Sequence, residues 1–122
     1  MKNYTLEVAA AKDIAIHWNE SHHLTTATLD MEQRKNFYLF FKEAINNAIK
    51  HSEAANIYIQ LAATNNGIQL QVQDDGQGFE TAASYRGNGI NNLKQRAALL
   101  KGHMNLQSAP GAGTTVKLHF RF

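Results

Sequence analysis

One stretch of the sequence constrains the possible fold of this chain more than any other: a run of alternating residues followed by two aspartates and two glycines. From residue 68 to residue 74, apolar residues alternate with glutamines, which predicts a strand with one buried face. Asp74 has the parity of the apolar residues, so its carboxylate should face the core, where it is costly unless a donor satisfies it. Gly76 and Gly78 follow, and they allow a sharp turn or the close approach of another molecule. An ordinary surface turn is the plain alternative for these residues taken alone.

Composition narrows the class of protein. The chain has 122 residues, 43% of them hydrophobic and 18% charged, which is typical of one soluble globular domain. It contains no cysteine, and therefore no disulfide or thiolate metal site, and no signal-peptide or membrane-spanning stretch is evident. The net charge of +2 is too small to indicate nucleic acid. The six histidines are scattered, so we expect no histidine metal site.

Periodicity predicts the order of the elements. Periods of two and of 3.6 residues predict strands near 14–19, 57–63, 68–74, 104–108 and 114–122, and helices over 30–51 and 90–101. Residues 1–12 could add a short helix. Asn65-Asn66-Gly67 between two predicted strands indicates an antiparallel hairpin. Together the elements predict an α+β fold, a two-layer α/β sandwich whose mixed, mostly antiparallel sheet is covered on one face by helices.

The first predicted helix is amphipathic. Asp30 and Gln33 could form a capping box at its start. Tyr38 and Phe40 should flank an apolar stripe made of Phe37, Phe41, Ala44, Ile45 and Ala48.

The polar side of this helix carries Glu43, Asn47 and Lys50, spaced i, i+4 and i+7. Such residues usually form a solvated face. As a set they also suit a metal ion and phosphates, with an amide oxygen as ligand, a carboxylate for water and an ammonium for anionic oxygens.

A second pair of glycines, Gly87 and Gly89, precedes the last predicted helix. Asn88 could cap that helix, and Gly102 is placed to end it. Amides at a helix N-terminus can bind an anion. The pattern is not the dinucleotide-binding fingerprint, because Asn92 occupies the third glycine position, and the sequence has no Gly-Lys-Ser/Thr of a P-loop.

Four motifs follow one another in the chain: Glu43-x-x-x-Asn47-x-x-Lys50-His51, Asp74-x-Gly76-x-Gly78, Gly87-x-Gly89 and Gly111-x-Gly113-Thr114. Over residues 30–122 they resemble the ATP-binding domain shared by sensor histidine kinases, DNA gyrase, Hsp90-type chaperones and mismatch-repair ATPases. Residues 87–102 are most similar to the bacterial two-component sensor kinases. The resemblance implies a Bergerat-type fold, in which ATP lies between the helices and a short lid.

The resemblance also implies roles for the polar helix face. Asn47 matches the Mg²⁺ ligand, and Glu43 matches the residue that positions or activates water, so these two are the candidate catalytic residues. Lys50 and His51 would face the phosphates.

At the end of the central strand, Asp74 looks like the residue that accepts a hydrogen bond from the exocyclic amine of adenine. Gly76 and Gly78 would let the backbone approach the base and the sugar, and Thr114 matches a further nucleotide-binding position. Residues 79–88 would be the lid.

The lid and the helix after it would bind the phosphates. Arg86 could reach the γ-phosphate, and Gly87 and Gly89 would supply backbone amides at the start of the helix.

In sensor kinases the phosphoryl group goes to a histidine on a separate dimerisation domain, which we do not find in this sequence. We therefore expect residues 1–122 to be a single ATPase domain and a monomeric fragment of a longer protein. That protein would be cytoplasmic, or anchored in the inner membrane with this domain on the cytoplasmic side. The expected partners are ATP with Mg²⁺, the protein's own dimerisation and phosphoacceptor domain, and a response regulator, with no nucleic acid.

Other functions stay open. An anti-sigma-factor serine kinase of the same superfamily would suit the length, and a pseudokinase module would keep ATP as a structural ligand. The similarity of residues 87–102 favours the sensor kinase. A nucleic-acid binder is least supported, because no basic cluster with interleaved aromatic residues is present.

Overall fold

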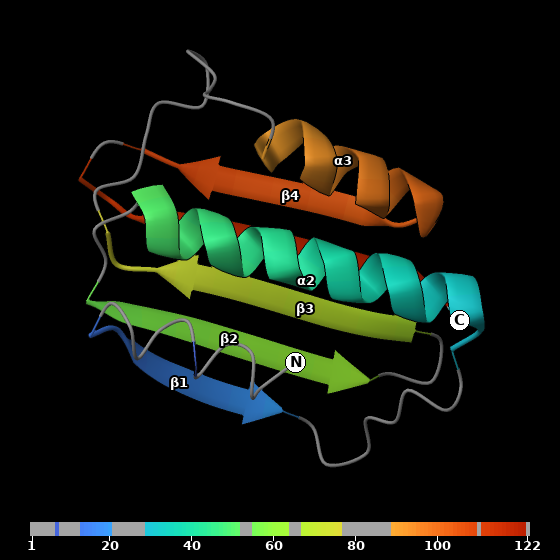
Figure 1. Cartoon of the computed structure of the whole chain (residues 1–122), viewed down its shortest axis with the longest axis horizontal. Coiled ribbons are helices and arrows are strands. Elements are labelled where there is room, and N and C mark those ends of the chain that lie inside the picture. The colour runs from blue at the N-terminus through green and yellow to red at the C-terminus, as the bar shows by residue number, and fades with distance from the viewer. Residues whose placement is uncertain are drawn as a thin grey trace.

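Five strands and two helices make up the described part of the computed structural model (Figure 1), which covers Glu7 and residues 13–20, 29–51, 55–63, 67–76, 89–109 and 111–121. In chain order they are β1 (Ala15–Glu20), α2 (Met31–His51), β2 (Asn56–Ala63), β3 (Gly67–Asp74), α3 (Gly89–Leu99), β4 (His103–Ser108) and β5 (Thr114–Arg121). Of Lys50, His51 and Gly89 only the backbone is described. The predicted α+β class is confirmed, while the short helix suggested for residues 1–12 lies outside the described residues except at Glu7.

The strands form one mixed sheet in the order β1-β2-β3-β5-β4. β2 and β3 pair antiparallel, as the hairpin signal predicted, and β3 pairs antiparallel with β5, which in turn pairs antiparallel with β4. β1 is the exception, because it runs parallel to β2. This connection passes through α2, as a parallel pair requires a crossover.

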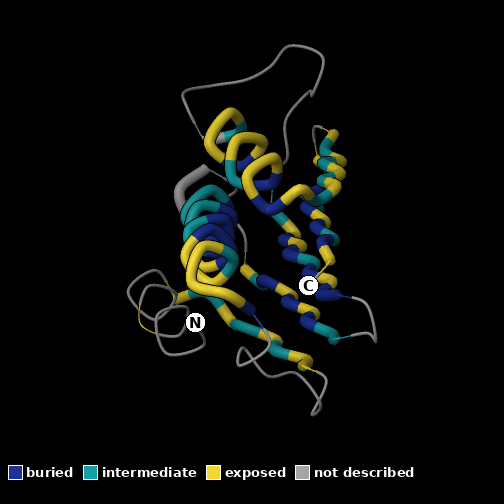
Figure 2. The backbone as a smooth tube through the Cα atoms, turned by 90° about the vertical axis from the view of Figure 1, so that its right-hand side faces the viewer, coloured by how far each residue is buried: buried dark blue, intermediate teal, exposed yellow. Residues whose placement is uncertain are grey.

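Both described helices pack on the same face of the sheet (Figure 2), and no described element covers the other face, called here the open face. Along β3 the side chains alternate between the two faces, with Ile68, Leu70 and Val72 buried under the helices and Gln69 and Gln73 exposed. The core lies between this face and the helices. The described helices cover only one face of the sheet. A strand side chain can therefore reach them only if it points to that face, as the apolar residues do, or lies at the end of a strand.

The start of α2 is a capping box, as predicted. The amide of Gln33 donates to Asp30 Oδ1 at 2.7 Å, and the amide of Asp30 donates to Gln33 Oε1 at 3.1 Å. Gln33 Nε2 also donates to the carbonyl of Arg121 at 3.0 Å, which ties the helix start to the end of β5. These contacts fix where α2 begins and how it enters the fold.

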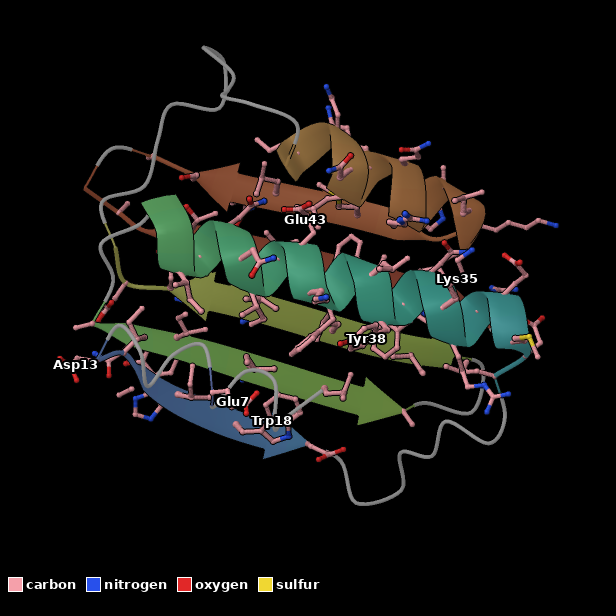
Figure 3. All side chains as sticks on the ribbon, in the orientation of Figure 1. Glu7, Asp13, Trp18, Lys35, Tyr38 and Glu43 are labelled. Carbon is pink, nitrogen blue, oxygen red and sulfur yellow. The ribbon has the colours of Figure 1, made fainter. Side chains whose placement is uncertain are left out.

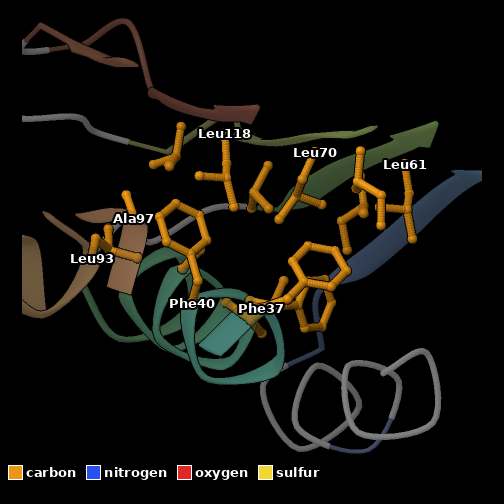
Figure 4. Close-up of a cluster of buried hydrophobic side chains, with 14 of the residues drawn as sticks. Phe37, Phe40, Leu61, Leu70, Leu93, Ala97 and Leu118 are labelled. Atoms are coloured by element: carbon orange, nitrogen blue, oxygen red, sulfur yellow. The ribbon is translucent and has the colours of Figure 1, made fainter. Parts of the chain in front are cut away.

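The buried surface of α2 is wider than the predicted stripe. All five predicted stripe residues are buried, and Phe40, expected only to flank the stripe, is fully buried too. Figure 4 shows the reason: Phe40 points between Leu93 and Ala97 of α3 and Leu118 of β5. A helix that packs against both a sheet and a second helix needs a broader apolar surface than one stripe supplies.

The end of α3 differs from the prediction. Lys101, and not Gly102, adopts the left-handed conformation, with φ of 55°. The amide of Gly102 bonds to the carbonyl of Ala97 at 2.9 Å and the amide of Lys101 to Ala98 at 3.0 Å, which is a Schellman motif. Gly102 is required for a different reason, because a Cβ there would lie 2.7 Å from the carbonyl oxygen of His119 on β5.

No helix in the described part of the chain is long and apolar enough to cross a membrane.

Candidate functional site

The C-terminal ends of α2 and β3 and the start of α3 lie at the same end of the molecule (Figure 1). Most of the predicted site residues that the structure describes are on these three elements. Asp74 ends β3, Glu43 and Asn47 lie in the second half of α2, and Gly89 begins α3. The fold therefore brings together motifs that are far apart in the sequence.

Asp74 faces the covered side of the sheet, as its parity predicted, and its side chain is only 4% exposed. Its Oδ1 accepts a hydrogen bond from the amide of Gly76 at 2.9 Å. Burial raises the pKa of Asp74 above its ordinary value, while the backbone N–H groups of Gly76 and Thr114 act in the opposite direction. A carboxylate held in this way is a hydrogen-bond acceptor at the edge of the core.

Thr114 and Gly113 pack against the backbone of Asp74. Thr114 is the register partner of Asp74 across β3 and β5, and it is half-buried. Gly113 has φ of 73°, and a Cβ there would collide with the carbonyl oxygen of Asp74. The hydroxyl of Ser108 donates to the carbonyl of Gly113 at 3.1 Å and lies 2.8 Å from Thr114 Oγ1. Close packing against Asp74 thus requires a glycine at position 113, the second glycine of the last motif.

The polar face of α2 is continuous. The helix runs unbroken to His51, so the positions of Glu43, Asn47 and Lys50 share one side of it. Glu43 and Asn47 are both half-buried. The Glu43 side chain lies between α2 and α3 (Figure 3), where its Oε1 accepts a hydrogen bond from Asn92 Nδ2 at 3.1 Å.

A second contact between the two helices was not predicted. Asn36 is a buried polar residue, with 2% of its surface exposed. Its Nδ2 donates to the carbonyl of Glu32 at 3.1 Å, and its Oδ1 accepts from Arg96 Nη1 at 3.0 Å. The available signal was its spacing, because Asn36 stands eight residues before Ala44 of the predicted apolar stripe, on the same side of the helix.

Asp75 has a structural role. Its Oδ1 accepts from the amides of Ala55 and Asn56, each at 2.9 Å, and its Oδ2 accepts from Asn56 Nδ2 at 2.8 Å. The Asn56 side-chain amide, first among these donors, lowers the pKa of Asp75. Asn56 Oδ1 is in turn 2.9 Å from His17 Nε2, and the His17 ring stacks on Tyr58 with 4.6 Å between centroids. The second aspartate of the motif therefore ties β3 to the start of β2.

Three predicted site residues, Gly78, Arg86 and Gly87, lie outside the described residues, as do the predicted lid over 79–88 and the Asn88 cap. Lys50 and His51 are placed only by their backbone on the last turn of α2. Within the described ranges, no group of three or more His, Cys, Asp or Glu side chains could hold a metal ion.

The open face of the sheet carries a hollow of about 500 Å³, lined by polar residues such as Gln60, Gln71, Lys117 and His119. None of the predicted site residues lines it. Its lining residues Gln60, Gln69 and Lys117 are exposed and alternate with the strand residues that are buried under the helices. The hollow is therefore separate from the predicted site residues on α2, β3 and α3.

Residues 32–122 match the family described as histidine kinase-, DNA gyrase B-, and HSP90-like ATPase. Among curated relatives, the sensor histidine kinase ComP of Bacillus subtilis is 33% identical over 91 residues, a match that covers 72% of this chain and 12% of ComP. The oxygen sensor histidine kinase NreB of Staphylococcus carnosus is 29% identical over 109 residues, covering 88% of this chain and 31% of NreB. The chain thus spans less than a third of the length of either relative.

Solved structures share the fold. The blue-light activated histidine kinase EL346 of Erythrobacter litoralis superposes with a TM-score of 0.76 and 20% identity, over 98% of this chain and 40% of that chain. Full-length ShkA in complex with AMPPNP superposes with a TM-score of 0.74 and 19% identity, over 97% of this chain and 28% of that chain. At this level of identity the likeness concerns the arrangement of the sheet and helices.

Proposed function

The chain belongs to the histidine kinase-, DNA gyrase B- and HSP90-like ATPase family, as the ATPase domain of a sensor histidine kinase, and we propose that it binds MgATP and phosphorylates a histidine on a separate dimerisation domain. In that reaction the bond between the γ-phosphorus and the β–γ bridging oxygen breaks, a phosphorus–nitrogen bond forms to the imidazole, and ADP leaves. The protein's contribution to such chemistry is mainly positioning and charge stabilisation.

The observation that carries the proposal is the buried carboxylate of Asp74 at the end of β3. Burial of this group is costly, and its raised pKa reflects that cost. The exocyclic amine of adenine would donate to the carboxylate, whereas guanine has a carbonyl oxygen at that position. Asp74 would therefore select adenine, with Gly76, Gly78 and Thr114 beside the base and sugar.

The polar face of α2 supports a role toward the phosphates. Mg²⁺ usually keeps several waters and takes one or two protein oxygens plus phosphate oxygens. A half-buried Asn47 with no described cluster of acidic residues around it fits that coordination. When bound, the metal would neutralise charge on the phosphates. Glu43 would orient the attacking group, and Lys50 and His51 would face the phosphates from the last turn of the helix.

The start of α3 supports phosphate binding by the backbone. Gly89 is the first residue of the helix, and free amides at a helix N-terminus favour anions. Gly87 and Arg86 precede it in the sequence, so we propose that they complete the phosphate site as part of a lid over residues 79–88.

The relatives of this chain are much longer than 122 residues. Since the chain spans 12% of ComP, we propose that residues 1–122 are one domain of a kinase with a dimerisation and phosphoacceptor domain elsewhere. Its further partner would be a response regulator, and the domain would work on the cytoplasmic side. No observation on this chain favours the anti-sigma-factor or pseudokinase alternatives.

Two measurements test the function. Calorimetry should detect binding of ATP with Mg²⁺, and radiolabelled ATP should leave the isolated chain unlabelled while labelling a phosphoacceptor domain supplied to it. Absence of binding at millimolar MgATP would remove the nucleotide site from the proposal. Acid-labile label on a histidine of the chain itself would contradict the need for a separate acceptor domain.

A further inference from the structure

Glu43 is held by a residue that the sequence motifs do not include. Asn92 Nδ2 donates to Glu43 Oε1 at 3.1 Å, although the two residues are 49 positions apart. Asn92 belongs to the first turn of α3, three residues after Gly89. The contact thus joins the polar face of α2 to the helix that follows the second glycine pair (Figure 3).

The packing of α3 does not depend on this contact. The apolar side of the helix and the turn that follows it are buried through Leu93, Ala97 and Leu100. In addition, Arg96 donates a hydrogen bond to the buried Asn36. Asn92 itself is exposed. A side chain at such a position normally contributes little to stability, so loss of its contact with Glu43 should leave the fold intact.

The chemistry of the pair suits a role in orienting the carboxylate of Glu43. A glutamate side chain has three rotatable bonds, and fixing it has a cost in conformational entropy. One donor on Oε1 restricts the carboxylate, and Oε2 accepts no hydrogen bond from a described residue. The second oxygen is then free to accept from a reacting group in a defined direction. An asparagine amide is suited to this task because it donates without introducing a charge.

We propose that Asn92 is a positioning residue for phosphoryl transfer, acting by orienting the carboxylate of Glu43; this inference rests on the proposed function. Orientation affects the reaction more than the binding of substrate, since a small misplacement of a reacting group can lower a rate by up to about 100-fold. Removal of the Asn92 amide should therefore lower the rate of transfer and leave the affinity for MgATP nearly unchanged.

The test uses the full-length protein to which we assign this domain, with four variants: Asn92→Ala, Asn92→Asp, Glu43→Ala and the double variant of Asn92→Ala with Glu43→Ala. Asn92→Asp keeps the shape of the side chain and places a like charge against Glu43. Asn91→Ala is the matched control, because Asn91 is the neighbouring exposed asparagine in the same helical turn. Thermal melting of each variant checks that the fold is intact.

We expect Asn92→Ala to slow single-turnover phosphoryl transfer about tenfold and Asn92→Asp to slow it at least as much, with the dissociation constant of MgATP changed less than about threefold. Asn91→Ala should match the parent protein. On the Glu43→Ala background, Asn92→Ala should have almost no further effect, because its target is gone.

Three results would overturn the assignment: equal rates for Asn92→Ala and Asn91→Ala, a loss that persists undiminished on the Glu43→Ala background, or a loss confined to ATP affinity. The parent protein separates this inference from the proposed function. If the parent transfers no phosphoryl group at all, the proposed function has failed and the role of Asn92 falls with it, before any variant is compared.

Discussion

Asp74 and Asp75 are adjacent in the sequence, yet their side chains face opposite environments and their pKa values shift in opposite directions. Asp74 is buried at the end of β3, and burial raises its pKa. Asp75 is exposed and accepts hydrogen bonds from the side chain and the backbone of Asn56 and from the backbone of Ala55, and these three donors lower its pKa. The first aspartate is therefore a buried carboxylate at the end of β3, and the second one links β3 to the start of β2.

Asp74→Asn should weaken ATP binding and preserve the fold. The change keeps the shape and one acceptor oxygen but removes the charge. A charge-assisted hydrogen bond is worth roughly 1.5–3 kcal/mol, which corresponds to about tenfold to more than a hundredfold in affinity. Calorimetry with ATP and GTP would measure the loss and the base preference, and circular dichroism would check folding. An unchanged ATP affinity would refute the role of Asp74.

Asp75→Asn should give the reverse result. The two backbone donors keep an acceptor, but the Asn56 side-chain amide would meet another amide group in place of Oδ2. We expect the melting temperature to fall by a few degrees, on the order of 2–5 °C, with ATP affinity little changed in the folded protein. A loss of ATP affinity equal to that of Asp74→Asn, measured below the melting temperature, would contradict the separation of roles.

The two aspartates should also differ in the pH dependence of stability. The pKa of Asp74 is raised in the folded state, so the folded chain binds the proton more tightly, and this group lowers stability as pH rises above the unfolded value of about 3.9. The pKa of Asp75 is lowered, so its contribution is present above that value and is lost as pH falls toward the folded pKa.

Melting curves from pH 3 to pH 7 would check this. Relative to the parent chain, Asp74→Asn should become more stable as pH rises, and Asp75→Asn should become less stable. Parallel curves for the two variants would show that the environments differ less than the structure indicates.

Gly113→Ala should destabilise the chain more than Gly111→Ala. Both glycines have positive φ, 73° and 79°, so alanine is strained at each by about 1–2 kcal/mol. Only at Gly113 would the added Cβ collide with the Asp74 carbonyl, since nothing lies within 4 Å at Gly111. The free energy of unfolding should therefore fall by about 2 kcal/mol more in Gly113→Ala, measured by urea titration. Equal losses would mean that the backbone relaxes around the methyl group.

Asn47→Ala should impair the use of Mg²⁺. If Asn47 is the protein ligand, its loss should raise the Mg²⁺ concentration needed for half-maximal ATP binding by at least about tenfold. Asn105→Ala is a suitable control, because Asn105 is an exposed asparagine on β4, far from the polar face of α2. A magnesium requirement identical in both variants would exclude Asn47 as the ligand.

Several parts of this protein follow from the sequence by itself, because they depend on repeats within one element. The period of two placed Asp74 with the buried residues of β3, and the period of 3.6 placed Glu43 and Asn47 on one side of α2. The capping box of Asp30 and Gln33 is likewise a local pattern. The backbone geometry of a single helix or strand determines such relations, whatever the rest of the chain does.

Only the tertiary structure decided the contacts between elements. Glu43 meets Asn92, and Asn36 meets Arg96, because α3 packs along α2, and no pattern within either helix specifies that placement. The burial of Phe40 has the same origin. In each case the two partners are far apart in the sequence, so their meeting depends on how the helices are oriented on the sheet, which is set by side-chain packing across the whole core and not by any local repeat.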